Sequence, residues 1–329
     1  MGEDKIDFVV TWVDGNDPAW LAEKSKYSPN GADARNARYR DWDQLKYWFR
    51  AIEKNAPWVN KIHFVTYGHL PKWLDTSNPK LHIVRHEDFI PKEYLPVFNS
   101  TAIEVHINKI PGLAEQFVYF NDDTYLMKPC KPTDFFRKGK PVDMLTLGQF
   151  PVNRVDEGEM YYCHLYNNYS VYRNYSRKKD ALRHFWKYMS PKYGRVAFSN
   201  FLNFFAKNLY IAPYHFGIPL LKSSMETIWT DHTAFMTMTA ASRFRSPINV
   251  NLQCIRSYQL ITGNFIPAKK SGVALDSSDP KTTKAVIESK KYRDLCISDN
   301  SRDDRFEDDK KEINESFERI FPGKCSFEL

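Results

Sequence analysis

The sequence predicts an α/β fold in which a mostly parallel sheet is covered by helices. Short apolar runs rich in Val, Ile, Phe and Tyr end at polar or turn residues, as buried strands do. Amphipathic helical patterns lie between several of these runs, and strands that alternate with helices usually pair in parallel. In such sheets ligands bind beyond the carboxyl ends of the strands, so the site should lie at that edge.

The elements are expected in the following order. The first helix should end before Pro57, because the residue before a proline disfavours helical backbone. A second helix, in 99–112, can be capped by Asn99 or Ser100, with Glu104 placed to complete a capping box. The strands are expected at 6–13, 61–68, 81–86 and 116–123, and the first helix within 43–58.

Composition indicates a globular protein in a reducing compartment. With 329 residues, 42% of them hydrophobic, the chain can bury a large core. The five cysteines are odd in number and form no C-x-x-C, so neither a disulfide framework nor a zinc site is expected. Asp7 and Asp14 interrupt the first apolar run, and no long uncharged stretch follows, so neither a signal peptide nor a membrane span is expected.

The net charge of +7 is unevenly distributed. The stretch 173–195 carries eight Lys or Arg and a single acid, Asp180, whereas 299–312 is rich in acids. One face should therefore be cationic. No nucleic-acid-binding motif accompanies the basic stretch, which fits an anionic membrane surface or a phosphate-bearing substrate instead.

Two predicted strands end in acids at the expected edge. Asp14 and Asp17 follow the first predicted strand, in a turn that contains Gly, Asn and Pro, and Asp122 and Asp123 lie at the end of the fourth. Neighbouring carboxylates repel, so they persist most easily where a cation or a polar substrate compensates them. The alternative is that such acids only cap turns or helices, which is common for Asp.

Longer motifs resemble a known family. The segments DFVVTWVDGNDPAW, RYRDWDQLKYWFRAIEKNAPW and LPVFNSTAIEVHINKIPGLAEQFVYFNDDTYL are similar to the first two conserved regions of the Stealth proteins, sugar-1-phosphate transferases of bacterial capsule and cell-wall synthesis. APYHFGIPLLKSS with SRFRSPINVN resembles the third region, and LCISDNSRDD the fourth. Trp42 and Val97 depart from the commonest pattern. The resemblance implies a Rossmann-like or GT-A-like sheet with a helical insert.

The resemblance also implies the reaction. A sugar-1-phosphate would pass from a UDP-hexose or UDP-N-acetylhexosamine to a hydroxyl of a glycan or lipid-linked oligosaccharide acceptor, giving a phosphodiester and UMP, with Mg²⁺ or Mn²⁺ as cofactor. Two other classes stay open. A conventional glycosyltransferase would use the same donor but release UDP, and a non-catalytic polysaccharide-binding protein would show aromatic platforms without the full set of acids, His and Arg.

Roles for individual residues follow from the resemblance. Asp122 and Asp123, with Asp299, would hold the cation that bridges the diphosphate. Arg245 would bind a phosphate oxygen through its fixed, always-charged donors. Either His215 or Asp123 would take the proton of the acceptor hydroxyl, and the sequence does not decide between them. The plainer readings are a packed His215, a surface ion pair at Arg245 and a solvated loop at Asp299.

Other residues are expected to bind the substrate. Gly15 would permit close approach of the backbone, and Trp12 offers a stacking face, unless it packs into the core. Asn99 and Ser100 can serve both as a helix cap and as substrate ligands. The complete substrate-binding set is Trp12, Asp14, Gly15, Asp17, Arg38, Asp41, Asn99 and Ser100.

Three segments are expected. Residues 1–136 form the nucleotide-sugar half, 137–210 a basic, mainly helical insert, and 211–329 the rest of the catalytic domain. Within the insert, helices are expected from Ser176 to the residue before Pro191 and over 196–211. These helices either pack on the core or rest on anionic lipid. The lipid contact would be made by Arg177, Lys178, Lys179 and Arg183. It would place the protein in the cytoplasm, at the inner face of the plasma membrane.

Overall fold

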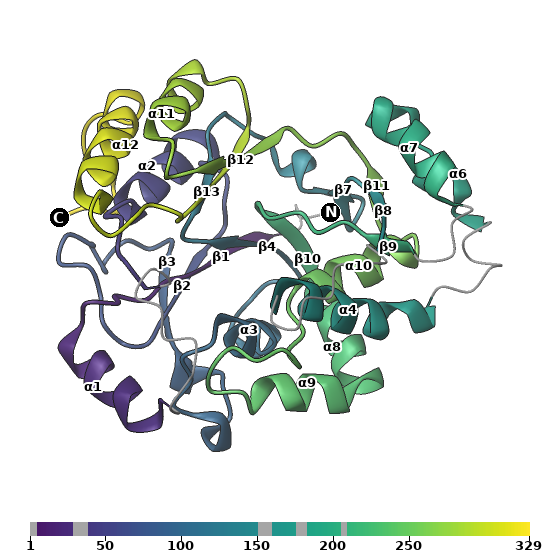
Figure 1. Cartoon of the computed structure of the whole chain (residues 1–329), viewed down its shortest axis with the longest axis horizontal. Coiled ribbons are helices and arrows are strands. Elements are labelled where there is room, and N and C mark those ends of the chain that lie inside the picture. The colour runs from purple at the N-terminus through teal and green to yellow at the C-terminus, as the bar shows by residue number, and fades with distance from the viewer. Residues whose placement is uncertain (1–4, 29–38, 151–159, 176–182, 205–208) are drawn as a thin grey trace.

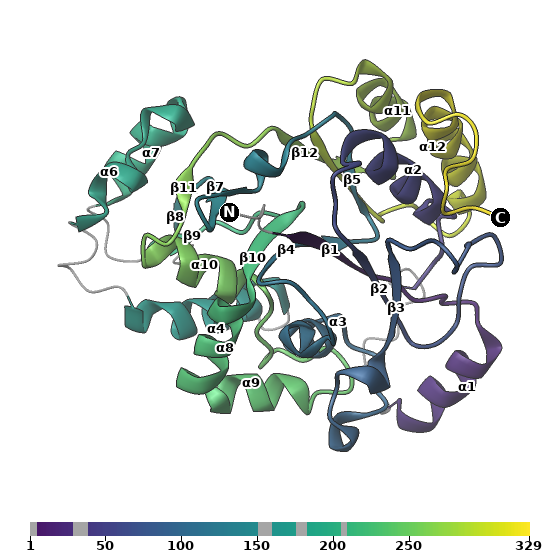
Figure 2. The same ribbon diagram turned by 180° about the vertical axis from the view of Figure 1, so that it is seen from behind.

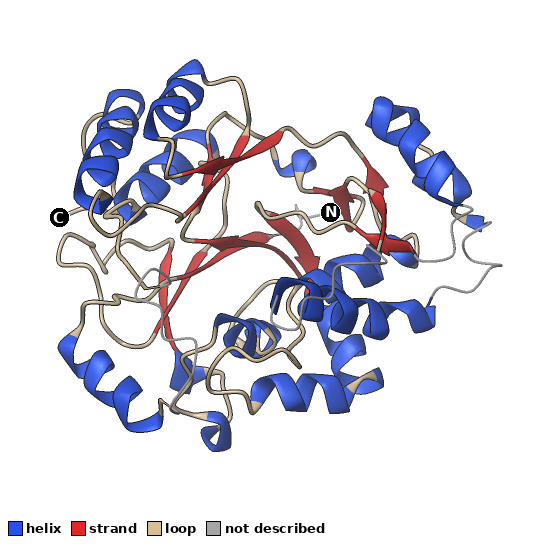
Figure 3. Ribbon diagram, viewed as in Figure 1, coloured by secondary structure: helices blue, strands red, loops and turns tan. Residues whose placement is uncertain are grey.

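A five-stranded sheet forms the centre of the molecule (Figures 1 and 3). The structure is a computed structural model that describes residues 5–28, 39–150, 160–175, 183–204 and 209–329. The strand order is β10-β4-β1-β2-β3, and every neighbouring pair is parallel except β10 with β4. The strands are β1 (Ile6–Thr11), β2 (Ile62–Thr66), β3 (Leu81–Arg85), β4 (Gln116–Asn121) and β10 (Ile218–Leu221).

The middle strand, β1, shows how the core is divided. Phe8 aligns with Ile62 of β2 and with Val118 of β4. Successive side chains of a strand point to opposite faces, so Phe8 and Val10 join one apolar cluster while Val9 joins the other. The predicted α/β fold, a mostly parallel sheet flanked by helices, is confirmed, and the first four strands lie within their expected ranges.

Helices cover both faces of the sheet, as Figures 1 and 2 show from opposite sides. One face packs against α2, α11 and α12, and the other against α3, α8, α9 and α10. A further helix, α1, follows β1. Their bounds are α1 Pro18–Tyr27, α2 Leu45–Asn55, α3 Ser100–Glu104, α8 Lys222–Asp231, α9 Thr233–Ala240, α10 Gln253–Ile261, α11 Pro280–Ser289 and α12 Phe306–Ile320.

The helix expected in 99–112 is shorter than predicted. Asn99 caps α3 as expected, since its side chain accepts a hydrogen bond from the Thr101 amide. The helix ends after five residues and a 3₁₀ turn follows, Ile107–Lys109. The capping box with Glu104 is wrong, because this carboxylate is buried and accepts the amide of Leu252 instead.

A second sheet brings two late strands, β12 and β13, to the edge of the central sheet where β1 and β4 end. In it β5 (Thr124–Leu126) pairs antiparallel with β13 (Asp294–Ser298), which pairs in parallel with β12 (Gly272–Asp276). Cys296 lies opposite Thr124 in this register. The fourth region of the sequence is therefore placed directly beside the turn that joins β4 to β5.

The middle of the chain mixes helices with short strands. Of the helix expected from Ser176, the structure describes α6 (Phe185–Tyr188), and 176–182 lie outside the described residues. The helix expected over 196–211 is wrong at its end, since α7 ends at residue 204 and Leu209–Ile211 forms β9, paired with β8. The remaining elements are β6 Phe136–Arg137, β7 Lys140–Asp143, β8 Leu147–Gln149, α4 Met160–Tyr172, α7 Arg195–Phe204 and β11 Ile266–Pro267.

The division into three segments stays a prediction. Strand β7 of the second segment pairs with β11 of the third, so the segments share a small sheet. Among the described helices, none has the length and apolarity that crossing a membrane requires.

Candidate active site

A cavity of about 1050 Å³ opens at the carboxyl ends of β1 and β4. Its wall is built by the ends of these strands, the β4–β5 turn, strand β13, helices α3 and α4, and the segments before α2, β10 and α10. Parallel sheets bind ligands at this edge, so the cavity lies where the sequence predicted a site. The predicted site residues that line it are Trp12, Asp41, Asn99, Ser100, Asp122, Asp123, His215, Arg245 and Asp299.

The turn between β4 and β5 presents both carboxylates to this cavity. Its backbone is fixed by the Tyr125 hydroxyl, which donates to the Asp122 carbonyl at 3.0 Å, and by the Ile297 amide, which donates to the Asp123 carbonyl at 3.0 Å. These two bonds hold the turn without the Asp123 carboxylate, whereas the Asp122 carboxylate also accepts the amides of residues 122 and 123. Asp123 differs in this from an acid that only caps a turn.

Asp123 meets residues from two distant parts of the chain. Its Oδ2 lies 3.6 Å from Nε2 of His215 and 3.6 Å from Sγ of Cys296. Desolvation lowers the pKa of His215, but the contacts with Asp123 and Cys296 outweigh it and raise this pKa well above its usual range. The imidazole and the carboxylate form an ion pair when the imidazole is protonated.

A chain of hydrogen bonds orients the His215 ring. The Asn121 side-chain nitrogen lies 3.1 Å from His215 Nε2, and Asn121 Oδ1 accepts the Tyr119 hydroxyl at 2.7 Å. Tyr119 also contacts the hydroxyl of Thr11 on β1 at 3.0 Å. Strands β1 and β4 therefore connect to the ring at the cavity through this chain of hydrogen bonds.

Asp122 is reached by the solvent of the cavity yet surrounded by protein. This desolvation, together with the charges of Asp123 and Asp41, raises the pKa of Asp122 to about 7. Neighbouring carboxylates that share a site repel each other in this way, and a bound cation removes the repulsion.

The chemistry of the donors fits a divalent cation. Asp123, His215 and Cys296 place one ligand atom each within 4.8 Å of one another, and Asp123 Oδ1 is a buried oxygen without a hydrogen-bond partner in the described chain. The set mixes oxygen, nitrogen and sulfur, as sites for transition-metal ions do, while Asp122 adds a further oxygen at the same turn. Cys296 was missed by the sequence analysis.

Asp299 lies apart from this group. It lines the cavity, but its two carboxylate oxygens accept hydrogen bonds from the guanidinium of Arg40 at 2.7 and 3.0 Å. The bidentate pair ties β13 to the segment before α2. Its role as a metal ligand stays a prediction, and the structure gives this carboxylate another partner.

Arg245 reaches the cavity from the segment that follows α9. Its Nη2 donates to the Ser100 hydroxyl at 2.6 Å, and the side chain is otherwise exposed. The buried amide of Asn99 holds that segment, since Nδ2 donates to the carbonyl of Ser242 at 2.9 Å and to Asn249 Oδ1 at 3.0 Å. Asn99 thereby fixes the position of Arg245 in addition to capping α3.

The acids after β1 are occupied by local structure. Asp17 caps α1 by accepting the Trp20 amide at 2.7 Å, and the carboxylate of Asp14 accepts the Asn16 amide at 2.9 Å. A Cβ on Gly15 would lie 1.8 Å from the carbonyl oxygen of Tyr39. The close approach that Gly15 permits is therefore to the neighbouring backbone, and these three residues do not line the cavity.

Three further predicted residues take different positions. Trp12 is 8% exposed and stacks on Phe64 with ring centroids 5.7 Å apart, while one part of it lines the cavity. Asp41 also lines the cavity, and desolvation raises its pKa. Arg38 lies outside the described residues.

Glu104 is a second residue that the sequence analysis did not assign to the site. It is buried, lines the cavity and accepts the Leu252 amide at 3.2 Å, and burial raises its pKa. The signal available in the sequence was a carboxylate on the apolar side of a short helix. Cys296 offered none, because a lone Cys in a buried strand is commonly a packing residue.

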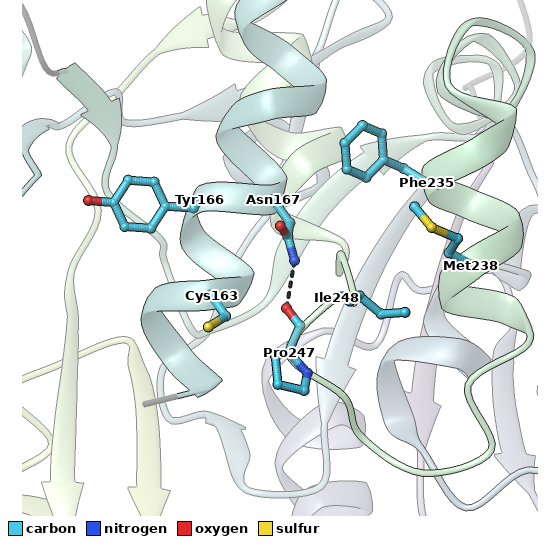
Figure 4. Close-up of a pocket in the computed structure, with 7 residues that line it drawn as sticks. All are labelled: Cys163, Tyr166, Asn167, Phe235, Met238, Pro247 and Ile248. Carbon is cyan, nitrogen blue, oxygen red and sulfur yellow. Dashed lines mark hydrogen bonds between the residues drawn. The ribbon is translucent and has the colours of Figure 1, made fainter. Parts of the chain in front are cut away.

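Figure 4 shows a smaller pocket, of about 340 Å³, between α4 and α9. The Asn167 side chain donates to the Pro247 carbonyl at 2.7 Å, and Phe235, Met238 and Ile248 supply most of the rest of the wall. No charged side chain lines this pocket within the described chain. The larger cavity is therefore the one suited to a phosphate-bearing substrate.

Comparison with protein-family models matches two regions of the chain. Residues 4–32 match the Stealth protein CR1 model, conserved region 1, and residues 38–143 match the CR2 model, conserved region 2. These segments supply β1, β4 and the β4–β5 turn.

Two relatives match nearly the full length of the chain, and a third matches part of it. The chain is 37% identical to the capsular polysaccharide phosphotransferase WcwK of Streptococcus pneumoniae over 98% of each chain. It is 37% identical to the receptor polysaccharide phosphotransferase WefC of Streptococcus oralis over 99% of each. A capsular polysaccharide phosphotransferase of Streptococcus thermophilus, eps5J, is 45% identical over 61% of this chain and 84% of its own.

Among solved structures, the galactosyltransferase LgtC in complex with donor and acceptor sugar analogues covers 93% of this chain and 95% of its own. Its TM-score is 0.39 at 11% identity. The glycosyltransferase GlyE of Streptococcus pneumoniae gives a TM-score of 0.26 at 11% identity.

Proposed function

The chain belongs to the Stealth protein family and is a phosphotransferase of polysaccharide synthesis, and we propose that it transfers a hexose-1-phosphate from a UDP-sugar to a glycan hydroxyl. The donor would be a UDP-hexose or a UDP-N-acetylhexosamine, and the nucleotide released would be UMP. This reaction joins sugar units through a phosphodiester.

One observation carries the proposal. A single cavity is lined by the guanidinium of Arg245, by the paired acids Asp122 and Asp123 and by His215. Phosphoryl transfer depends on positioning and on neutralising charge at the phosphate oxygens, and little covalent help is needed. A cavity of about 1050 Å³ is also at the upper end of the size range of ligand sites, as an extended nucleotide-sugar requires.

The transfer itself is a displacement at phosphorus. The acceptor oxygen attacks the phosphorus next to the sugar, the bond from that phosphorus to the bridging oxygen breaks, and UMP leaves with the bridging oxygen. Arg245 would stabilise the negative charge of the non-bridging oxygens through its guanidinium donors. Ser100, which Arg245 contacts at 2.6 Å, would keep the guanidinium directed at the phosphate.

The residues around Asp123 can serve two purposes. Asp123, or His215 in its neutral form, is at hand to take the proton of the acceptor hydroxyl. Asp122 and Asp123 offer the carboxylate oxygens that Mg²⁺ and Mn²⁺ prefer, and we propose one of these ions as the cation, with His215 and Cys296 beside Asp123 as further donors for Mn²⁺. The cation would neutralise charge on the donor diphosphate.

Binding measurements separate the two roles of His215. If His215 is a ligand, His215→Asn should weaken Mn²⁺ binding to the protein without substrate. If His215 only moves a proton, Mn²⁺ binding should stay unchanged while turnover falls.

We further propose that the acceptor is a glycan carried on a lipid, at the inner face of the plasma membrane, where UDP-sugars are available. Of the four cations predicted to contact lipid, Arg183 is exposed in the structure, and Arg177, Lys178 and Lys179 lie outside the described residues.

The test is product analysis. The protein is incubated with a panel of UDP-sugars and either a lipid-linked or a soluble oligosaccharide, and both products are identified by mass spectrometry. We expect UMP and an acceptor heavier by a hexose-phosphate. UDP with a phosphate-free glycoside would overturn the proposal and identify a conventional glycosyltransferase.

A further inference from the structure

Two neighbouring helices, α6 and α7, expose large apolar side chains to solvent. We call residues 183–204 the helical arm. Within it Trp186 is 80% exposed, Phe198 67% and Leu202 58%. Phe198 and Leu202 are four residues apart on α7 and so share one side of that helix. Large apolar side chains that stay this exposed in neighbouring helices often mark an interaction site.

The arm is also cationic throughout. Residues 183–204 contain Arg183, Lys187, Lys192 and Arg195 and no Asp or Glu. Arg195 lies three residues before Phe198 on α7, so a cation borders the apolar side of the helix.

The inner side of the arm is fixed to the rest of the protein. Asn200 is fully buried, and its side chain accepts the Leu147 amide at 2.8 Å and donates to the carbonyls of Leu145 and Tyr188. The ammonium of Lys187 donates to the carbonyls of Gly263 and Phe265, in the segment just before β11. The exposed residues therefore belong to an anchored surface, and their exposure is a stable property of the fold.

Figures 1 and 2 place α6 and α7 together at one edge of the molecule, away from the central sheet. Neither the large cavity nor the smaller pocket is lined by residues of the arm. No step of sugar-phosphate transfer thus accounts for its exposed side chains.

We propose that the outer surface of the helical arm binds an anionic lipid bilayer. Trp and other apolar side chains enter the boundary between headgroups and acyl chains, and Lys and Arg attract anionic headgroups. A second copy of the chain is a poor occupant, because two surfaces that carry cations and no acids would repel each other. The binding is independent of the chemistry in the cavity, and it would hold that cavity near a lipid-linked acceptor.

Vesicle flotation tests the cationic part. The protein is mixed with vesicles of phosphatidylglycerol and phosphatidylcholine, or of phosphatidylcholine alone, at low and high salt. We expect binding to the anionic vesicles at low salt only. Lys192→Gln with Arg195→Gln should weaken it about thirty-fold at low salt, at about fivefold per cation. The matched control is Lys72→Gln with Lys281→Gln, two exposed cations elsewhere, which should change binding little.

Fluorescence tests the apolar part. Vesicles of brominated lipid should quench Trp186, and the quenching should disappear in Trp186→Phe. Phe198→Ser with Leu202→Ser should also weaken vesicle binding, whereas Leu21→Ser, at another exposed apolar position, should not. UMP release with a soluble acceptor should be unchanged in all of these variants, so vesicle binding and the transfer reaction are judged separately.

Three outcomes would overturn the proposal. The first is that the unmodified protein fails to float with anionic vesicles. The second is that the control substitutions at Lys72 and Lys281 reduce flotation as much as those at Lys192 and Arg195 do. In the third, sedimentation shows self-association that Trp186→Ser abolishes, which would make the arm an interface between copies of the chain.

Discussion

The loops that follow β1 and β4 begin from the same sequence pattern, a buried strand and then two acids, but their carboxylates have different partners. After β1, Asp14 and Asp17 accept hydrogen bonds from nearby amides. After β4, both acids face a cavity; the Asp122 carboxylate also accepts amides of its own turn, whereas the turn is held without the Asp123 carboxylate. An acid whose turn does not need it remains available to a ligand, and the pattern alone does not reveal which case applies.

Two arginines of the third region also differ in whether they face the cavity or contact other parts of the protein. Arg245 lines the cavity and contacts Ser100. Arg243, two residues earlier, points to other partners, since its guanidinium lies 4.8 Å from the centre of the Tyr27 ring and 3.4 Å from the Leu95 carbonyl. One arginine is placed for a phosphate and the other for packing between segments.

The largest effect is expected at Asp123. Asp123→Asn removes the charge and keeps the size, so turnover to UMP should fall by at least ~10²-fold. The free energy of unfolding should change by less than about 1 kcal/mol, because the β4–β5 turn is held through main-chain atoms and the Tyr125 hydroxyl. Steady-state kinetics and urea denaturation measure the two quantities.

Asp17→Asn is the matched control for that change, since Asn also caps helices well and the residue lies outside the cavity. If both variants lose activity equally, or if Asp123→Asn unfolds the protein, the distinction between the two loops is wrong.

The second-largest loss of turnover is expected at Arg245, with Arg243 as its control. Arg245→Lys keeps the charge but loses the planar fork of donors, so kcat should fall by about tenfold or more, as for a group that binds the phosphate in the transition state. Arg243→Lys should change kcat by less than about twofold, the range of a surface substitution. Similar losses for the two variants would mean that Arg245 has no special role at the phosphate.

Metal binding gives the third test. Activity should disappear in EDTA and return with Mg²⁺ or Mn²⁺. Cys296→Ser should weaken Mn²⁺ binding, measured by calorimetry without substrate, by at least about tenfold, the scale on which even outer-shell partners act. Cys163→Ser, in the small apolar pocket, is the control and should bind Mn²⁺ normally. Full activity in EDTA would exclude the cation.

The sequence predicted the strands and the acid-bearing edge because both depend on local features, the alternation of apolar runs and the residues that end them. It could not place Cys296, which reaches Asp123 through the antiparallel pairing of β13 with β5. Likewise, the partner of Asp299 is Arg40, far away in the chain. These contacts follow from tertiary packing, which has no short-range signal in the sequence.

The smallest effect on turnover is expected at Asp17, where a substitution should reduce stability but not activity. Asp17→Ala removes the acceptor of the Trp20 amide at the start of α1, so the free energy of unfolding should fall by about 1 kcal/mol. Trp20 is buried against Tyr39, with ring centroids 5.0 Å apart, so loosening this end of α1 should also lower the melting temperature slightly. Turnover at a temperature well below unfolding should stay within about twofold, because this carboxylate does not line the cavity. A large loss of turnover in a protein that remains folded would show that the β1 loop contacts the donor directly, as the sequence analysis expected.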